Sequence, residues 1–217
     1  MSTILQQLIN SVSVGGLYAL LAVGYALIYS VFDFTNFAFG GIMMVSAFAG
    51  YFSTQLGLGT IPAMFVAIVA GVALSVAVEL LAYRPMRKRN AKRLFLMISA
   101  MGVNIFLTNL FLCVFGANLR TLPSGFASNT ITLWGVQVGT VDIVAFITSA
   151  ISLAILCFFL YKTRSGIAVR ASAIDMSTAG IMGINVNRIS LIVFVISGIT
   201  AAIAGMFFGM KYTVYPG

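Results

Sequence analysis

Long apolar runs separated by short polar segments extend along the whole chain. A helix needs about 20 apolar residues to cross the hydrocarbon core of a bilayer. The sequence has six runs of that size, which predicts six membrane-spanning helices in a single transmembrane domain that covers residues 1–217. Their expected ranges are 12–31, 37–56, 61–82, 94–116, 143–161 and 189–210.

The composition agrees with this pattern. Of the 217 residues, 61% are hydrophobic and 7% are charged, whereas soluble domains carry roughly 25% charged residues. Water cannot cover so much apolar surface, because too few charged side chains are available to face it. The sequence therefore predicts an all-α integral membrane protein. Its net charge of +8 is attributed to membrane orientation, not to nucleic-acid binding.

Ten of the twelve basic residues lie in two segments, 83–93 and 162–188. Two predicted spans separate these segments, so both must face the same side, and the positive-inside rule makes that side the cytoplasm. The N-terminus and segment 117–142 are then outside. Glu79, at the cytoplasmic end of the third span, is expected either to snorkel toward the interface or to pair with the basic segment that follows.

The external segment contains TITLWGVQVGTVDI, in which apolar and polar residues alternate around Gly135. This alternation predicts a short β-hairpin or an extended flap. Trp134 in its centre is interpreted as an interfacial anchor, and a contact with a partner protein is the alternative.

The stretch DFTNFAFGG, residues 33–41, is too short and too apolar for an ordinary loop. One interpretation is a broken or re-entrant segment that lines an aqueous pathway. The other is a tight helical hairpin in which Asp33 caps the second span. Asp33 and Asn36 are therefore candidate pathway residues. Asn104 and Asn109 in the fourth span are two more, although amides within a span also commonly bond to a neighbouring helix.

Segment 162–188 keeps small and apolar residues at helical spacing between its charges. Asp175 is a suitable N-cap and Gly183 a suitable terminator, so we expect two short helices, about 166–174 and 176–182, on the cytoplasmic face. An amphipathic helix that rests in the lipid headgroups would carry Trp, Phe or Leu anchors. This segment has none between Thr163 and Arg188, which favours a slim helix that enters a groove on a cytoplasmic protein.

Several stretches, in this order, resemble the membrane-permease subunits of bacterial branched-chain amino-acid ABC importers. They are GLYALLAVGYALIYSVFDFTNFAFGG, LAYRPMRKR, TRSGIAVRASAIDMSTAGIMGINVNR and FVISGITAAIAGMFFG. In that family the third stretch is the cytoplasmic coupling segment that docks into a groove on the ATPase. The positions that carry this resemblance are Gly166, Arg170, Ala171, Asp175, Ala179, Gly183, Ile184 and Asn185.

The resemblance implies an ATP-driven, alternating-access importer in the bacterial inner membrane. Its implied partners are cytoplasmic ABC ATPase subunits, a second homologous permease subunit and a periplasmic or extracellular substrate-binding protein. ATP and magnesium would bind to the ATPase, because this chain has no GxxxxGK[ST] phosphate-binding loop and is expected to bind no cofactor itself. With no histidine and four scattered acids, the sequence predicts no catalytic residues and no metal site.

Two departures from the family pattern affect these expectations. Where the family commonly has NFAHGE, this chain has NFAFGG, with Phe39 and Gly41 in place of histidine and glutamate. Urea or short amides therefore stay open as alternative substrates. Family members also continue for about two more spans, so Gly217 is expected to be a truncation point. A gradient-driven secondary transporter, in which Asp33 is the intramembrane acid, is the alternative of a different class.

Overall fold

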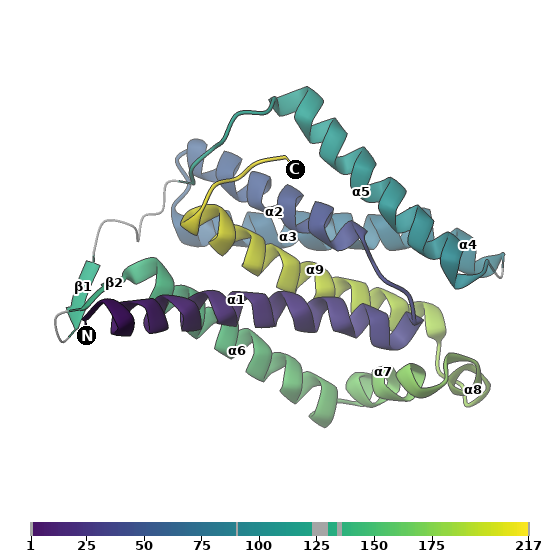
Figure 1. The fold of residues 1–217 in the computed structure, drawn as a ribbon. Helices are drawn as coiled ribbons and strands as arrows, with labels where there is room; N and C mark the ends of the chain where they lie inside the picture. The colour runs from purple at the N-terminus through teal and green to yellow at the C-terminus, as the bar shows by residue number, and fades with distance from the viewer. Residues whose placement is uncertain (1, 90, 123–129, 134–135, 217) are drawn as a thin grey trace.

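The computed structural model describes residues 2–89, 91–122, 130–133 and 136–216. Long helices run back and forth across the molecule, and shorter helices gather at one of its ends (Figure 1). In chain order the elements are α1 (Ser2–Phe32), α2 (Ala38–Gln55), α3 (Thr60–Val78), the π-helix η1 (Glu79–Tyr83), α4 (Arg84–Lys88), α5 (Arg93–Phe115), β1 (Thr130–Leu133), β2 (Val136–Gly139), α6 (Thr140–Lys162), α7 (Arg164–Ile174), α8 (Met176–Ile181) and α9 (Val186–Lys211).

Helix α9 is the central element of the fold. It packs against α1, α2, α3 and α6 (Figure 1). Glycines allow the closest approaches, because a Cβ atom at Gly198 would lie 2.9 Å from the carbonyl oxygen of Gly71 on α3. A Cβ at Gly205 would lie 2.6 Å from the carbonyl oxygen of Met43 on α2. Helices in lipid associate through such close packing, since the bilayer provides no hydrophobic force between them.

The structure has a helix at each of the six predicted spans, and five of them are long and apolar enough to cross a membrane. The exception among the six is α2, which has 18 residues and contains both glycines and polar side chains. This helix packs against α3, α5 and α9, and half of its residues are buried. It faces protein more than lipid, so it does not need the apolar composition of the other spans.

Several predicted boundaries were wrong. The first helix begins at Ser2, ten residues before the predicted start, and the basic segment 83–93 contains helix α4 where a loop was expected. The irregular stretch near the start covers residues 33–37 only, because Gly40 and Gly41 lie within α2. The glycine pair therefore lies within a helix and does not unwind the backbone.

The predicted hairpin is confirmed as two short antiparallel strands, with Thr130 opposite Gly139 and Leu133 opposite Val136. Trp134, Gly135 and Gly217 lie outside the residues that the structure describes, so the expectations about them are untested.

Both basic segments lie at one end of the molecule, together with the α1–α2 link, α4, α7 and α8, while the hairpin and the N-terminus lie at the other (Figure 1). The predicted sidedness requires both basic segments to lie on the same side of the membrane, and their placement at one end of the molecule meets that requirement. The assignment of the basic end to the cytoplasm stays a prediction. We refer to this end, which holds residues 83–93 and 162–188, as the basic end.

A buried polar cluster joins three elements near the basic end. Glu79 is 1% exposed and forms an ion pair with Arg87, whose Nη1 donates to Oε2 at 3.0 Å. Ser190 Oγ on α9 donates to Glu79 Oε1 at 2.6 Å. The Arg87 guanidinium also lies 4.8 Å from the centre of the Phe32 ring. Pairing of Glu79 with the basic segment, one of the two predicted alternatives, is thus confirmed.

Candidate functional site

The segment between α6 and α9 begins with a tight junction. Thr163 is the N-cap of α7, and its Oγ1 accepts a hydrogen bond from the Gly166 amide at 3.0 Å and donates one to the Phe159 carbonyl at 2.6 Å. A Cβ atom at Gly166 would lie 2.2 Å from the Phe159 carbonyl oxygen and 2.6 Å from that of Leu160. Only glycine fits this position, because the close neighbours are backbone atoms of α6. Helix α7 is therefore held directly against the end of α6.

Asp175 separates α7 from α8 and is the N-cap of α8, as predicted. Its Oδ1 accepts hydrogen bonds from the amides of Ser177 at 2.9 Å and Thr178 at 3.2 Å. The hydroxyl groups of both residues also donate to the carboxylate. These four hydrogen bonds hold the pKa of Asp175 well below its ordinary value. The hydroxyl bonds from Ser177 and Thr178 contribute most, and the two amide bonds contribute less. An ionised cap at a helix N-terminus is electrostatically favourable.

Gly183 ends the second short helix, again as predicted. Its φ is +87°, a left-handed conformation that favours glycine. The Ile184 amide donates to the Ala179 carbonyl at 3.1 Å, and the Gly183 amide donates to that of Gly180 at 3.1 Å. These two bonds form a Schellman motif, which satisfies carbonyl groups at the end of the helix. The observed helices, α7 at Arg164–Ile174 and α8 at Met176–Ile181, match the predicted pair within two residues at each end.

The coupling segment, defined as residues 163–185, has an inner face and an outer face. Gly166, Val169 and Ala179 are buried against the rest of the chain. Ala171 and Ile184 are half-buried, and Arg170, Asp175 and Gly183 are exposed. The outer face carries apolar side chains at the ends of both helices, which are the highly exposed Ile174, Ile181 and Met182.

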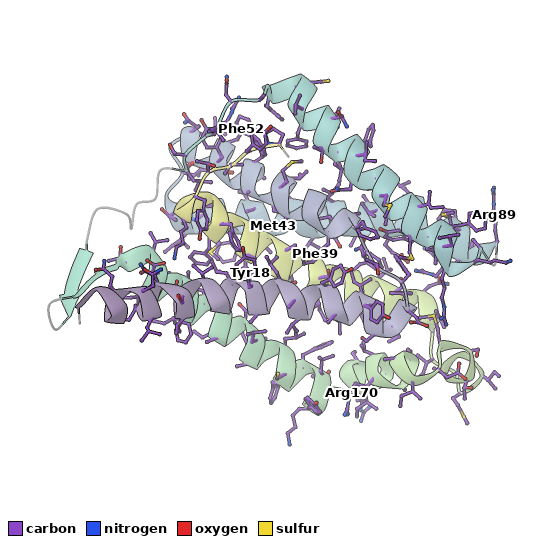
Figure 2. The ribbon with its side chains drawn as sticks, in the orientation of Figure 1. Tyr18, Phe39, Met43, Phe52, Arg89 and Arg170 are labelled. Carbon is purple, nitrogen blue, oxygen red and sulfur yellow. The ribbon has the colours of Figure 1, made fainter. Side chains whose placement is uncertain are left out.

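Arg170 points toward the end of α6 and is labelled beside it in Figure 2. Its guanidinium carbon lies 4.9 Å from the centre of the Tyr161 ring, which is within the range of a cation–π contact. This contact leaves the charge of Arg170 accessible at the surface of the basic end.

Asp33, the first candidate pathway residue, lies at the basic end. Its φ of +54° is unusual for a residue other than glycine. The carboxylate forms an ion pair with Arg93 at the start of α5, and both side chains are at least half exposed. The two residues line an open pocket of about 600 Å³ whose opposite wall includes Ser172 and Ser177. Asp33 thus faces the coupling segment.

Asn36 is buried where α2 begins. Its Oδ1 accepts a hydrogen bond from the Tyr83 hydroxyl at 2.6 Å and another from the Ala38 amide at 3.2 Å. The suggestion that Asp33 caps the second span was wrong, because the residue at the N-cap position is Phe37 and Asn36 satisfies the first amide. Residues 33–37 form an irregular segment between α1 and α2, and both helices pack against α9. The helix is thus broken here as expected, and the membrane depth of the segment stays a prediction. The pathway role of Asn36 stays a prediction.

The two asparagines of α5 differ in their surroundings. Asn109 is exposed, and its Nδ2 donates to the Ile105 carbonyl of the same helix at 2.8 Å. Asn104 faces α2 instead, because a Cβ atom at Gly41 would lie 2.9 Å from its Oδ1 and one at Gly40 would lie 4.0 Å away. The structure therefore brings Asn104 to the α2 surface and leaves Asn109 apart from it.

A stripe of tyrosines on α1 was not identified from the sequence. Tyr18, Tyr25 and Tyr29 lie seven and four residues apart, a spacing that places them on one helical face. Tyr18 contacts Phe208 with ring centres 5.2 Å apart, and Tyr25 contacts Phe39 at 6.2 Å. The sequence signal was available, since hydroxyl groups at helical spacing within an apolar run identify this face.

Within the part of the chain that the structure describes, no group of three carboxylate, thiol or imidazole side chains is placed to hold a metal ion. The described residues instead form two capped short helices at the basic end, with packed helices behind them. The expectation that the chain binds no cofactor stays a prediction.

Comparison with known proteins identifies the family to which this chain belongs. The family model of the permease component of branched-chain amino acid transport systems matches residues 7–217. The chain is 33% identical to the high-affinity branched-chain amino acid transport system permease protein BraD of Pseudomonas aeruginosa, over 97% of this chain and 72% of that protein. It is 34% identical to the LivH permease proteins of Escherichia coli and Salmonella typhimurium, with the same coverage. No solved structure matches. The chain therefore belongs to the permease components of branched-chain amino acid transport systems and is a membrane-embedded transport subunit.

Proposed function

We propose that the chain is the permease subunit of an ATP-driven importer of branched-chain amino acids in a bacterial inner membrane. Its similarity to branched-chain amino acid transport permease proteins supports the substrate class. The coupling segment supports an ATP-driven mechanism, because its outer face is available to a cytoplasmic partner.

One observation carries the proposal, namely that the coupling segment is rigidly joined to the membrane helices. Gly166 seats α7 against the backbone of α6, and Ile184 packs against the buried cluster that includes residues of α9. Asp175 and Gly183 fix the two ends of α8 by local hydrogen bonds. A force applied to the segment would therefore move α6 and α9 rather than bend the segment.

The outer face has the chemistry of a docking surface. Ile174, Ile181 and Met182 are 89%, 85% and 79% exposed, and they lie at the helix ends where a groove can receive them. Apolar side chains grouped at a surface commonly mark a site of protein–protein interaction, and a short helix that enters a groove is a recurrent mode of recognition. The expected receiver is a cytoplasmic ATPase that binds ATP and magnesium. A second permease subunit and an external substrate-binding protein complete the proposed assembly.

Affinity purification from native membranes in mild detergent tests this proposal. The wild-type chain should recover an ATPase with a phosphate-binding loop, and the Arg170→Ala/Asp175→Ala variant should lose it. Arg89→Ala is the matched control, because Arg89 is an exposed arginine of the same basic end that lies outside the coupling segment (Figure 2). The control should recover as much ATPase as the wild type.

Reconstitution of the purified assembly in proteoliposomes then tests energy source and substrate. Uptake of leucine, isoleucine or valine that requires ATP supports the proposal. Recovery of an equal amount of ATPase with the double variant would contradict the role of the coupling segment. Uptake driven by a proton gradient without an ATPase would indicate a secondary transporter. ATP-dependent uptake of urea or short amides alone would show that these, and not branched-chain amino acids, are the substrates.

A further inference from the structure

A pocket of about 280 Å³ lies between α2 and α9, away from the coupling segment. Its volume is close to the lower limit of about 300 Å³ that is typical of small-molecule sites. Helix α2 and helix α9 form its two walls, and the chain that follows α9 forms its edge. The lining residues include Gly40 and Met43 on α2, Phe208 on α9, and Tyr212, Thr213 and Tyr215 after it.

The pocket has an apolar floor and a polar rim. Met43, Met44, Ala47 and Phe208 provide the thioether, methyl and ring surfaces of the floor. The hydroxyl groups of Tyr212, Thr213 and Tyr215 belong to residues at the edge, and all three of these residues are exposed. Asn104 is not one of the lining residues, and its amide oxygen would lie 4.0 Å from a Cβ atom at Gly40. The described residues that line the pocket include no charged side chain, so the pocket is suited to a solute without net charge.

We propose that this pocket receives the aliphatic side chain of the transported amino acid while its ammonium and carboxylate groups stay at the polar rim. This inference rests on the proposed function and specifies how the substrate class is selected. A zwitterion has no net charge, and its ammonium group can donate to the hydroxyl oxygens of Tyr212, Thr213 and Tyr215 at the edge. Its carboxylate can accept from the hydroxyl groups at the edge. Methionine side chains adapt to branched alkyl groups of different shape.

The same chemistry discriminates against the alternative substrates. Urea and short amides have little or no alkyl surface, so they would leave the thioether and methyl groups of the floor without a partner. A hydrophobic pocket separates ligands that differ by one methylene by about 10- to 200-fold. Selection among aliphatic side chains should therefore depend on how much space the floor provides.

Gly40 controls that space. A Cβ atom at Gly40 would have one described neighbour within 4 Å, the Asn104 Oδ1 at 4.0 Å, so an alanine fits without a clash. The other glycines nearby are different, because a Cβ at Gly41 or Gly205 would lie 2.9 Å from Asn104 Oδ1 or 2.6 Å from the Met43 carbonyl oxygen. Gly40 therefore serves the pocket, whereas Gly41 and Gly205 serve helix packing.

The test uses the intact transporter in proteoliposomes, with the same binding protein in every assay. The measured quantity is the ratio of kcat/KM for leucine to kcat/KM for alanine. Gly40→Ala should lower this ratio by roughly tenfold, because the added methyl group occupies the space of the longer side chain. Gly102→Ala is the matched control, since Gly102 is an exposed helical glycine with no neighbour within 4 Å and does not line the pocket.

A second variant keeps the inference testable if Gly40→Ala fails to assemble. Met43→Ala enlarges the floor and should raise the kcat/KM of phenylalanine relative to that of leucine. An unchanged substrate ratio in the assembled variants would overturn the pocket assignment and leave the proposed function intact. A wild-type transporter that carries no branched-chain amino acid would overturn the proposed function and this inference together.

Discussion

Replacement of Glu79 by leucine should destabilise the protein strongly. The change keeps a side chain of similar size, so it tests the loss of charge and hydrogen bonding rather than the creation of a cavity. It leaves Arg87 without its carboxylate partner and Ser190 without an acceptor. Both partners come from elements that pack against η1, which holds Glu79, so their loss affects the fold around the basic end.

The structure bounds the size of this effect. Removal of one partner from a buried ion pair typically costs about 3–5 kcal/mol. Arg87 is 16% exposed and rests on the Phe32 ring, so part of its charge stays solvated and the lower limit, about 3 kcal/mol, is expected. The hydrogen bond that Ser190 loses adds about 1 kcal/mol.

Equilibrium unfolding in mixed micelles, titrated with sodium dodecyl sulfate and followed by helical circular dichroism, measures this loss. The double variant Glu79→Leu/Arg87→Met removes both charges and is the control, because paired replacement by apolar residues is often neutral or stabilising. It should recover most of the stability that the single variant loses. An unchanged unfolding midpoint for Glu79→Leu, or a double variant as unstable as the single one, would refute the buried-pair argument.

Three further predictions concern the basic end. Asp33→Gly should change the free energy of unfolding by less than about 1 kcal/mol, because it relieves a positive φ and loses only an exposed ion pair with Arg93; a larger loss in the same titration would contradict this. Gly166→Ala should destabilise the chain by at least about 1–3 kcal/mol through its clash with the Phe159 carbonyl, and normal stability in that variant would disprove the close contact. Because the pKa of Asp175 is lowered, its ionised cap contributes fully to the stability of α8 above the ordinary pKa of 3.8. That contribution is lost only as the pH falls through the lower pKa of the folded state. Amide-exchange protection factors in α8 should therefore be the same at pH 7 and pH 5, and a fall over that interval would refute the assignment.

Features that depend on local sequence were predictable. The apolar runs placed the six long helices because span length follows from bilayer thickness. Asp175 and Gly183 bounded α8 because caps act through hydrogen bonds within a few residues of the helix end. The alternation on either side of Gly135 likewise placed two paired strands, since hairpin signals are short-range.

Features that depend on contacts between distant residues were not predictable. Capping of α2 was one of the two interpretations of Asp33, but its partner is Arg93 and its backbone is left-handed, which no nearby residue indicates. Asn36 bonds to Tyr83 across 47 positions of sequence. The pocket between α2 and α9 could not be anticipated either, because its lining comes from segments more than 150 residues apart and depends on how the two helices cross.

The central place of α9 has a consequence for biosynthesis. Helices α1, α2 and α3 leave the ribosome well before α9, although each of them packs against it. At about 5 to 20 residues per second, roughly 7 to 27 s pass between completion of α3 and completion of α9. During that interval the surfaces that α9 will cover, including the glycine contact at Gly71, face lipid or the insertion machinery. Slowed synthesis between α3 and α9 would therefore prolong the time for which these surfaces lack their partner helix.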